Sequence, residues 1–240
     1  MYPDIYIDNS FDTKCDVLCD EQGMRWYPWV GRDYAKAEQK ILVLLESHYE
    51  NKNNHQTITQ RNFTQRVISD RVHAQTFWKN EALDRLNTLL CGREIQPQEA
   101  HLLWERVCFC EFVQRPMNKA KKEQPTHEDF AQGWAIFPRL LEVLRPDFCV
   151  CAGMAFANHQ CNFPVGFSLK NYAWKEKFDS NNTRSPYIRT PFSFCYHDLE
   201  IPAVIVQHPS KIYGPANLKK WRDVLIAQAP AQMQYLMGPF

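Results

Sequence analysis

The sequence contains no long apolar run and no recognisable export segment. None of its segments approaches the ~20 consecutive apolar residues that a membrane-spanning helix needs. The first residues, Met-Tyr-Pro-Asp-Ile-Tyr, lack the charged region followed by an apolar region that defines a signal peptide. These two absences argue against a membrane partner and lead us to expect a cytoplasmic protein.

Glycine-rich turns are also missing where nucleotide-binding and hydrolase sites need them. The first predicted strand, at residues 41–45, leads into Glu46-Ser47-His48-Tyr49, a segment without glycine. A dinucleotide-binding fold and a phosphate-cradling loop both need glycines in that turn, so neither is indicated. The G-x-S-x-G elbow of serine hydrolases is absent too, although a nucleophile pair of Ser47 and His208 stays open as an alternative.

The nine cysteines form no recognisable disulfide or metal-binding pattern. Their number is odd, and Cys108, Cys110, Cys149 and Cys151 lie inside apolar segments that are typical of buried strands. Reduced, buried thiols fit this distribution better than disulfides do. We therefore expect neither a structural metal nor a cofactor.

The overall charge does not decide the class of partner. The formal net charge is +1, but Lys and Arg are clustered at residues 119–122 and 211–222. A nucleic-acid-binding protein needs local positive surface rather than a high overall charge. The clusters therefore fit either a DNA-binding surface or an ordinary solvated face.

Four short apolar segments alternate with helical patterns along the chain. Strands are predicted at 41–45, 107–110, 148–152 and 203–207, and helices within 67–90, from 97, at 127–144 and at about 215–228. Such alternation indicates a parallel sheet covered by helices on both faces. We predict one α/β domain over residues 1–240, a three-layer α/β/α sandwich with a central four-stranded parallel sheet. Residues 1–36 are expected to be an irregular extension, and 162–200 a long loop or insertion.

Polar side chains follow the predicted strands at their carboxyl ends. Because ligands of open α/β sheets bind there, we expect these residues to form one site. The set contains two carboxyl groups, imidazoles and hydroxyls, which suit acid–base or electrostatic catalysis. The polar residues at these strand ends are Glu46, Ser47, His48, Tyr49, Glu111, His208 and Ser210.

Read in order, four segments resemble motifs of the uracil-DNA glycosylase superfamily. Leu45–Tyr49 stands where that family has Gly-Gln-Asp-Pro-Tyr, and the segment 110–116 resembles its base-reading strand. The segment 144–153 is similar to its third strand, and His208-Pro-Ser-Lys-Ile212 resembles its motif His-Pro-Ser-Pro-Leu. The likeness spans about residues 26–225, and the last motif is the most specific. It implies the same parallel sheet and a DNA glycosylase that flips a base out of the duplex.

The resemblance also implies roles in catalysis and in base binding. His208 would hold an oxygen of the leaving base and stabilise the negative charge that develops on it. Tyr49 would form a wall of the base pocket. Phe63 or Phe77 would stack on the base, and core packing is the alternative role for either. No lysine is expected at the site to form a Schiff base, so the enzyme would be monofunctional and would leave an abasic site.

The segment after the His-Pro-Ser motif is expected to contact DNA. Ile212 and Tyr213 stand where the family places a wedge residue that fills the vacated stack, and Lys211 adds a positive charge. His48 and Ser210 follow the predicted strands at 41–45 and 203–207, and both are expected to contribute to substrate binding. DNA with a flipped base is the expected partner, and no protein partner is evident.

Two departures from the family pattern affect the predicted chemistry. The family's water-activating Asp corresponds to Ser47, which cannot act as a carboxylate base. Glu46 or Glu50 would substitute for it, or the reaction would proceed mainly by stabilising the leaving group. The missing Asp also leaves open a non-catalytic binder of modified or damaged DNA on the same fold.

The second departure concerns specificity, because Glu111 occupies the position of a base-reading Asn. Asn can donate and accept, which suits uracil, whereas an ionised Glu only accepts, which suits the exocyclic amine of cytosine or adenine. The sequence therefore predicts excision of a modified cytosine, hydroxymethylated or glucosylated, in defence against phages. The segment 162–196 would bind the added group. The alternative is a structural Glu111 paired with Arg115.

Overall fold

A computed structural model describes residues 5–73, 81–96, 99–153, 163–170 and 191–238, and the described chain is an α/β protein. Its main sheet has seven strands in the order β1-β4-β2-β6-β9-β8-β7. These strands are β1 (Trp29–Val30), β2 (Ile41–Leu45), β4 (Val107–Glu111), β6 (Phe148–Ala152), β7 (Phe167–Lys170), β8 (Phe192–Tyr196) and β9 (Leu199–Val206). A second, two-stranded sheet pairs β3 (Tyr49–Glu50) with β5 (Met117–Asn118).

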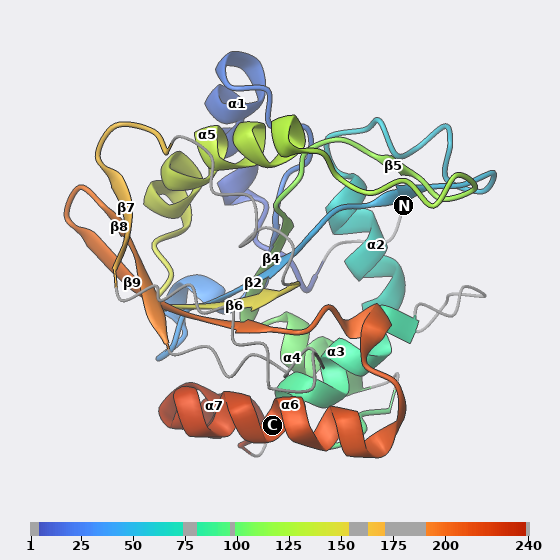
Figure 1. Cartoon of the computed structure of the whole chain (residues 1–240), viewed down its shortest axis with the longest axis vertical. Coiled ribbons are helices and arrows are strands. Elements are labelled where there is room, and N and C mark those ends of the chain that lie inside the picture. The colour runs from blue at the N-terminus through green and yellow to red at the C-terminus, as the bar shows by residue number, and fades with distance from the viewer. Residues whose placement is uncertain (1–4, 74–80, 97–98, 154–162, 171–190, 239–240) are drawn as a thin grey trace, which may run out of the picture.

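Helices cover both faces of the main sheet (Figure 1). Helices α1 and α5 lie on one face, and the other five lie on the opposite face (Figure 1). The helices are α1 (Ser10–Glu21), α2 (Phe63–Val72), α3 (Glu81–Cys91), α4 (Ala100–Trp104), α5 (His127–Leu144), α6 (Gly214–Gln228) and α7 (Pro230–Met237). None of the helices in these described ranges is long and apolar enough to cross a membrane.

The four predicted strands form the parallel centre of the sheet. Strands β4, β2, β6 and β9 pair in parallel, with Val43 opposite Val150 and Val150 opposite Val204. Every residue of β2, β4 and β6 is buried, as strands between two helix layers require. The prediction of an α/β fold with these parallel strands is confirmed. The prediction of four strands is wrong for the whole sheet, which is mixed because β1, β8 and β7 add antiparallel pairs.

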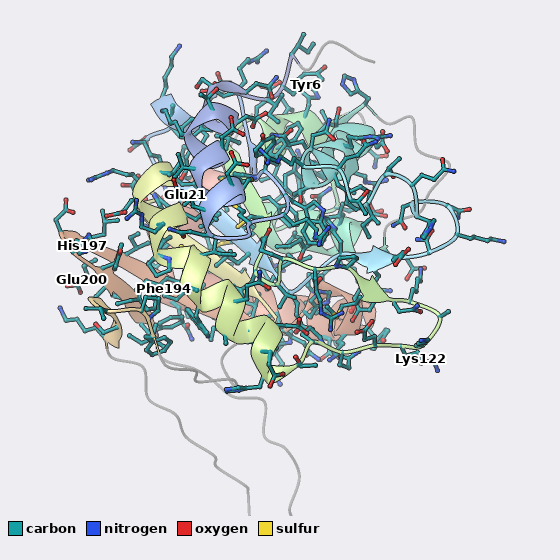
Figure 2. All side chains as sticks on the ribbon, turned by 90° about the horizontal axis from the view of Figure 1, so that it is seen from above. Tyr6, Glu21, Lys122, Phe194, His197 and Glu200 are labelled. Carbon is teal, nitrogen blue, oxygen red and sulfur yellow. The ribbon has the colours of Figure 1, made fainter. Side chains whose placement is uncertain are left out.

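The segment 162–200 is not a long loop in its described parts. Residues of β7 pair antiparallel with β8, and β8 pairs antiparallel with β9, so this segment extends the sheet. Phe194 of β8 lies against α5, where its ring is 4.9 Å from that of Phe137 (Figure 2). Alternate aromatic residues at 192, 194 and 196 face this core, a strand signal that the surrounding Asn, Ser and Pro residues conceal. Residues 154–162 and 171–190 lie outside the described residues.

The N-terminal segment also differs from the prediction of an irregular extension. Helix α1 buries Phe11, Cys15 and Leu18, which share one face and pack into the same core as α5. The helical spacing of these three residues is present in the sequence, but polar neighbours make the segment weakly amphipathic. Strand β1 and the 3₁₀ helix η1 (Tyr34–Lys36) follow.

Helix boundaries follow local capping signals where the sequence carries them. Helix α5 has the predicted bounds, and Thr126 and Asp129 form a reciprocal capping box at its N-terminus. It ends at Arg145, which has a left-handed φ of 45° and precedes a proline. The predicted helical segment 67–90 contains two helices, α2 and α3. Helix α7 was not predicted.

Candidate active site

The carboxyl ends of the parallel strands bring distant polar residues together. Leu45, the last residue of β2, is paired with Glu111, the last residue of β4, so Glu46 and Glu111 leave the sheet side by side. Gly153 follows β6, and a methyl group built on it would lie 3.6 Å from Cδ2 of His208 and 3.9 Å from Oε2 of Glu46. Glu46 and His208 therefore flank the same small space above Gly153. The predicted convergence of these strand ends is present in the structure.

His208 is held by its own loop in one tautomeric form. It caps the 3₁₀ helix η4 (Pro209–Lys211), where its Nδ1 accepts from the backbone N–H of Ser210 at 3.2 Å and lies 2.8 Å from the Ser210 hydroxyl. A backbone N–H can only donate, so Nδ1 is an acceptor and the neutral ring carries its proton on Nε2. Burial, together with the charge of Lys211, lowers the pKa of His208 to about 4. At neutral pH His208 therefore offers an uncharged Nε2–H donor.

Glu46, which shares the space above Gly153 with His208, carries a carboxyl group that could activate water. Burial raises the pKa of Glu46, and the charge of Lys211 partly offsets this. No described residue forms a hydrogen bond or an ion pair with its carboxyl group. Glu50, the other predicted substitute for the family's Asp, is in close contact with Nδ1 of His55 instead. The geometry therefore favours Glu46 over Glu50 as a base.

Glu111 and His48 form a buried pair beside Glu46. Nδ1 of His48 lies 3.4 Å from Oε1 of Glu111, and Nε2 of His48 lies 2.9 Å from the hydroxyl oxygen of Thr64 in α2. The rings of Trp26 and Phe63 meet the His48 ring edge-on, each with centroids 4.9 Å away. Burial lowers the pKa of His48 to about 3, so the ring is neutral.

The protonation state of Glu111 differs from the one assumed in the sequence argument. Burial, reinforced by the charge of Glu46, raises the pKa of Glu111 to about 8. Burial therefore favours the neutral acid form of Glu111 at pH 7, and repulsion between the two carboxyl groups disfavours charging both of them at once. A neutral Glu111 could donate a hydrogen bond as well as accept one, which runs against the premise of an ionised carboxylate that only accepts. Arg115 is not its partner, because Arg115 pairs with Asp129 and Glu123.

Three predicted site residues have structural contacts in place of the expected ones. The hydroxyl of Ser47 donates to the backbone carbonyl of Arg115 at 2.7 Å and forms no hydrogen bond with His208, so it anchors a loop. Phe63 is buried against the His48 ring and Trp26, where it cannot stack on a base. Ile212 is only 1% exposed and packs in the core, so the prediction that it is a wedge is wrong. Phe77 lies outside the described residues.

Tyr213, Lys211 and Tyr49 remain accessible around the site. The side chain of Tyr213 is 67% exposed, and the guanidinium of Arg85 lies 5.4 Å from its ring centroid. Arg85, on α3, also donates to the carbonyl of Ser210 at 3.3 Å. Tyr49 is half-buried, and burial followed by the charge of Glu46 raises the pKa of its hydroxyl.

Sequence reasoning missed Thr64 and Arg85. Both lie on helices remote in sequence from the strand ends that they contact, and neither belongs to a motif. Only the packing of α2 and α3 beside the loops at 47–49 and 209–213 brings them to the site. No pattern in the sequence alone could have identified them.

Within the described ranges, no group of three His, Cys, Asp or Glu side chains could hold a metal ion. Burial raises the pKa values of the thiols of Cys108, Cys110, Cys149 and Cys151 well above the usual range, so these groups are protonated and inert. The ionisable groups that the strand ends bring together are Glu46, Glu111 and His208. Comparison with protein-family models and with curated proteins gives no match.

Proposed function

We propose that this protein is a monofunctional DNA glycosylase that flips a base out of DNA and excises it. The observation that carries the proposal is the placement of a neutral His208 across Gly153 from the carboxyl group of Glu46. In the described part of the chain, neither Nε2 of His208 nor this carboxyl group has a hydrogen-bond partner. The resemblance of residues 208–212 to the glycosylase motif His-Pro-Ser-Pro-Leu supports the same reading.

Breaking a glycosidic bond places negative charge on the departing base. The Nε2–H of His208 would donate to a base oxygen and stabilise this charge without transferring its proton. Lys211 adds a positive charge that acts on both His208 and Glu46. On the sugar side, Glu46 would orient a water molecule and accept a proton from it as that water attacks the anomeric carbon.

A modified cytosine is the proposed base. The O–H of a neutral Glu111 would donate to the ring N3 of cytosine, an acceptor that uracil does not offer. A neutral Glu111 thus favours the same base that an ionised Glu111 would. Ordinary cytosine must be rejected, so an added hydroxymethyl or glucosyl group would be recognised, in keeping with a role in phage defence.

Base excision is tested with duplexes that carry uracil, hydroxymethylcytosine or glucosylated hydroxymethylcytosine. We expect the protein to produce alkali-labile sites in one of the cytosine duplexes, and His208→Ala to lose this activity while still binding DNA. His197→Ala is the matched control, because His197 is an exposed histidine paired with Glu142 at a distant hairpin. DNA binding without any alkali-labile site would instead favour the non-catalytic binder. That alternative is supported by Ser47, whose hydroxyl is bonded to a backbone carbonyl at the position of the family's catalytic Asp.

The position of Lys211 makes it possible to test whether the enzyme also cuts the DNA strand through a Schiff base. The expectation that no lysine lies near the site needs correction, because the charge of Lys211 reaches both His208 and Glu46. A monofunctional enzyme should not be trapped on DNA by borohydride, whereas a Schiff base with Lys211 would be. A fluorophosphonate probe tests the hydrolase alternative, and we expect no labelling at Ser47.

A further inference from the structure

One oxygen of Glu111 is buried and has no hydrogen-bond partner among the residues that the structure describes. Glu111 is 4% exposed, its Oε1 faces Nδ1 of His48 at 3.4 Å, and its Oε2 is unpaired. Leaving a buried polar group unsatisfied costs about 1–3 kcal/mol, so such an atom in a site is expected to meet a ligand. The unpaired Oε2 therefore marks where a substrate group would complete the hydrogen bonds.

The orientation of this carboxyl group depends on a chain of buried contacts. His48 contacts Glu111 through one nitrogen and the Thr64 hydroxyl through the other, at 2.9 Å. The Trp26 and Phe63 rings hold the imidazole plane from two sides. A Thr64 hydroxyl that donates to Nε2 would leave the ring proton on Nδ1, which lies 3.4 Å from Oε1, while Oε2 has no hydrogen-bond partner among the described residues.

We propose that His48, itself held by Thr64, is a positioning residue that directs Oε2 of Glu111 to the Watson–Crick edge of the flipped base. This inference rests on the proposed glycosylase function. The burial that keeps Glu111 neutral lets Oε2 donate to a ring nitrogen, which ordinary uracil does not present as an acceptor. The titratable groups that face Glu111 are Glu46, His48, Tyr49 and Cys110.

The test replaces both supporting residues by apolar groups of similar shape. The double variant His48→Phe/Thr64→Val keeps the aromatic packing and leaves no buried hydroxyl without a partner, so it should fold. Thr88→Val is the matched control, since the Thr88 hydroxyl donates to a backbone carbonyl within α3. Thermal unfolding checks that all three proteins are native.

The readout is kcat/KM between pH 6 and 9.5 on the hydroxymethylcytosine or glucosylated duplex that the wild type excises. Wild-type activity should fall as Glu111 ionises. The double variant should lose about 100-fold in kcat/KM through misplacement of the carboxyl group. Its fall should move to higher pH, because the ionised carboxylate has lost an N–H donor.

Two outcomes contradict the inference in distinguishable ways. If the folded double variant keeps the wild-type kcat/KM and pH profile, His48 and Thr64 do not position Glu111, and the glycosylase assignment stands. If the wild type itself releases no base from any of these duplexes, the proposed function fails and this inference fails with it.

Discussion

His208 has different surroundings at its two ring nitrogens, and this difference determines what it can do. Nδ1 is occupied by the backbone N–H and hydroxyl of Ser210, so only Nε2–H can reach a substrate. The lowered pKa, about 4, keeps the ring uncharged throughout the physiological range. His208 is thus suited to donating a hydrogen bond to a developing anion rather than a full proton.

Removing this donor should impair the chemical step. We expect His208→Ala to lower kcat by roughly 100- to 1,000-fold, the usual cost of losing one donor to a developing oxyanion. Single-turnover kinetics on the excised duplex measure this, with fluorescence anisotropy for DNA affinity. A variant with wild-type kcat would show that another group stabilises the leaving base.

Glu46 should be required for water attack. Because its carboxyl group is unpaired and its pKa is raised by burial, we expect Glu46→Gln to lower kcat roughly 100-fold or more. Glu50→Gln is the control, since Glu50 is engaged by His55 and should be dispensable. Full activity of Glu46→Gln would mean that leaving-group stabilisation alone drives the reaction.

At the scale of elements, η4 and the residues after it depend on Arg85 of α3. Arg85 donates to the carbonyl of Ser210 and lies over the Tyr213 ring, so it ties this loop to the helix. The amides of Lys211 and Ile212, which bond to the carbonyls of residues 208 and 209, are also within this loop. The loop that presents His208 and Tyr213 is therefore held from outside its own sequence.

Arg85→Ala should loosen this loop. We expect faster hydrogen exchange at the amides of Lys211 and Ile212, about 1 kcal/mol less stability, and weaker DNA binding. Arg85→Lys keeps the charge but loses the planar guanidinium group. Its hydrogen exchange, stability and DNA binding should lie between those of the wild type and those of Arg85→Ala. Unchanged exchange at these amides in Arg85→Ala would contradict the role given to Arg85.

The elements that sequence reasoning predicts well are those whose pattern is local. The strands at 41–45 and 148–152 are unbroken apolar runs, and α5 has both an amphipathic face and a capping box. Helix α1 and strand β8 were missed because their buried residues are interspersed with polar ones. The site was predicted at the ends of the strands that form it. The sequence did not indicate which of the adjacent residues Ile212 and Tyr213 faces the core. Ile212 turns into the core and Tyr213 out of it because of the tertiary packing around η4.

At the scale of the whole molecule, the site lies where helix layers meet the carboxyl ends of the parallel strands. Glu111 lies on the same face of β4 as Val107 and Phe109, which belong to a buried core cluster, and its side chain is only 4% exposed. The fold therefore keeps a carboxyl group neutral, and folding stability must depend on its protonation.

Stability should fall in a defined pH window because of Glu111. Glu111 has a pKa of about 8 in the folded protein and 4.5 in the unfolded chain, so the folded protein binds the Glu111 proton more tightly. The stability that this proton contributes is complete below pH 4.5 and is lost as the pH rises to about 8. Relative to Glu111→Gln, we expect the wild type to lose on the order of 2–4 kcal/mol across this window. Urea unfolding at pH 5 and pH 8.5 measures it. Parallel pH dependences of the two proteins would show that Glu111 is not buried as described.

The buried histidines act in the opposite direction. His48 and His208 have pKa values lowered to about 3 and about 4, so their contribution to stability is complete above 6.5 and is lost as pH falls towards those values. The wild type should therefore be most stable at mildly acidic pH. It should lose stability at lower pH because of the histidines and at higher pH because of Glu111.

The most direct test of the proposed function is mass spectrometry of the bases released from duplexes containing cytosine, uracil, hydroxymethylcytosine or glucosylated hydroxymethylcytosine. We predict that the wild type releases a modified cytosine as a free base, in equal amount to the abasic sites formed, and leaves ordinary cytosine in place. His208→Ala should release none at the same protein concentration. Binding of the wild type to these duplexes with no free base detected would contradict the proposed function.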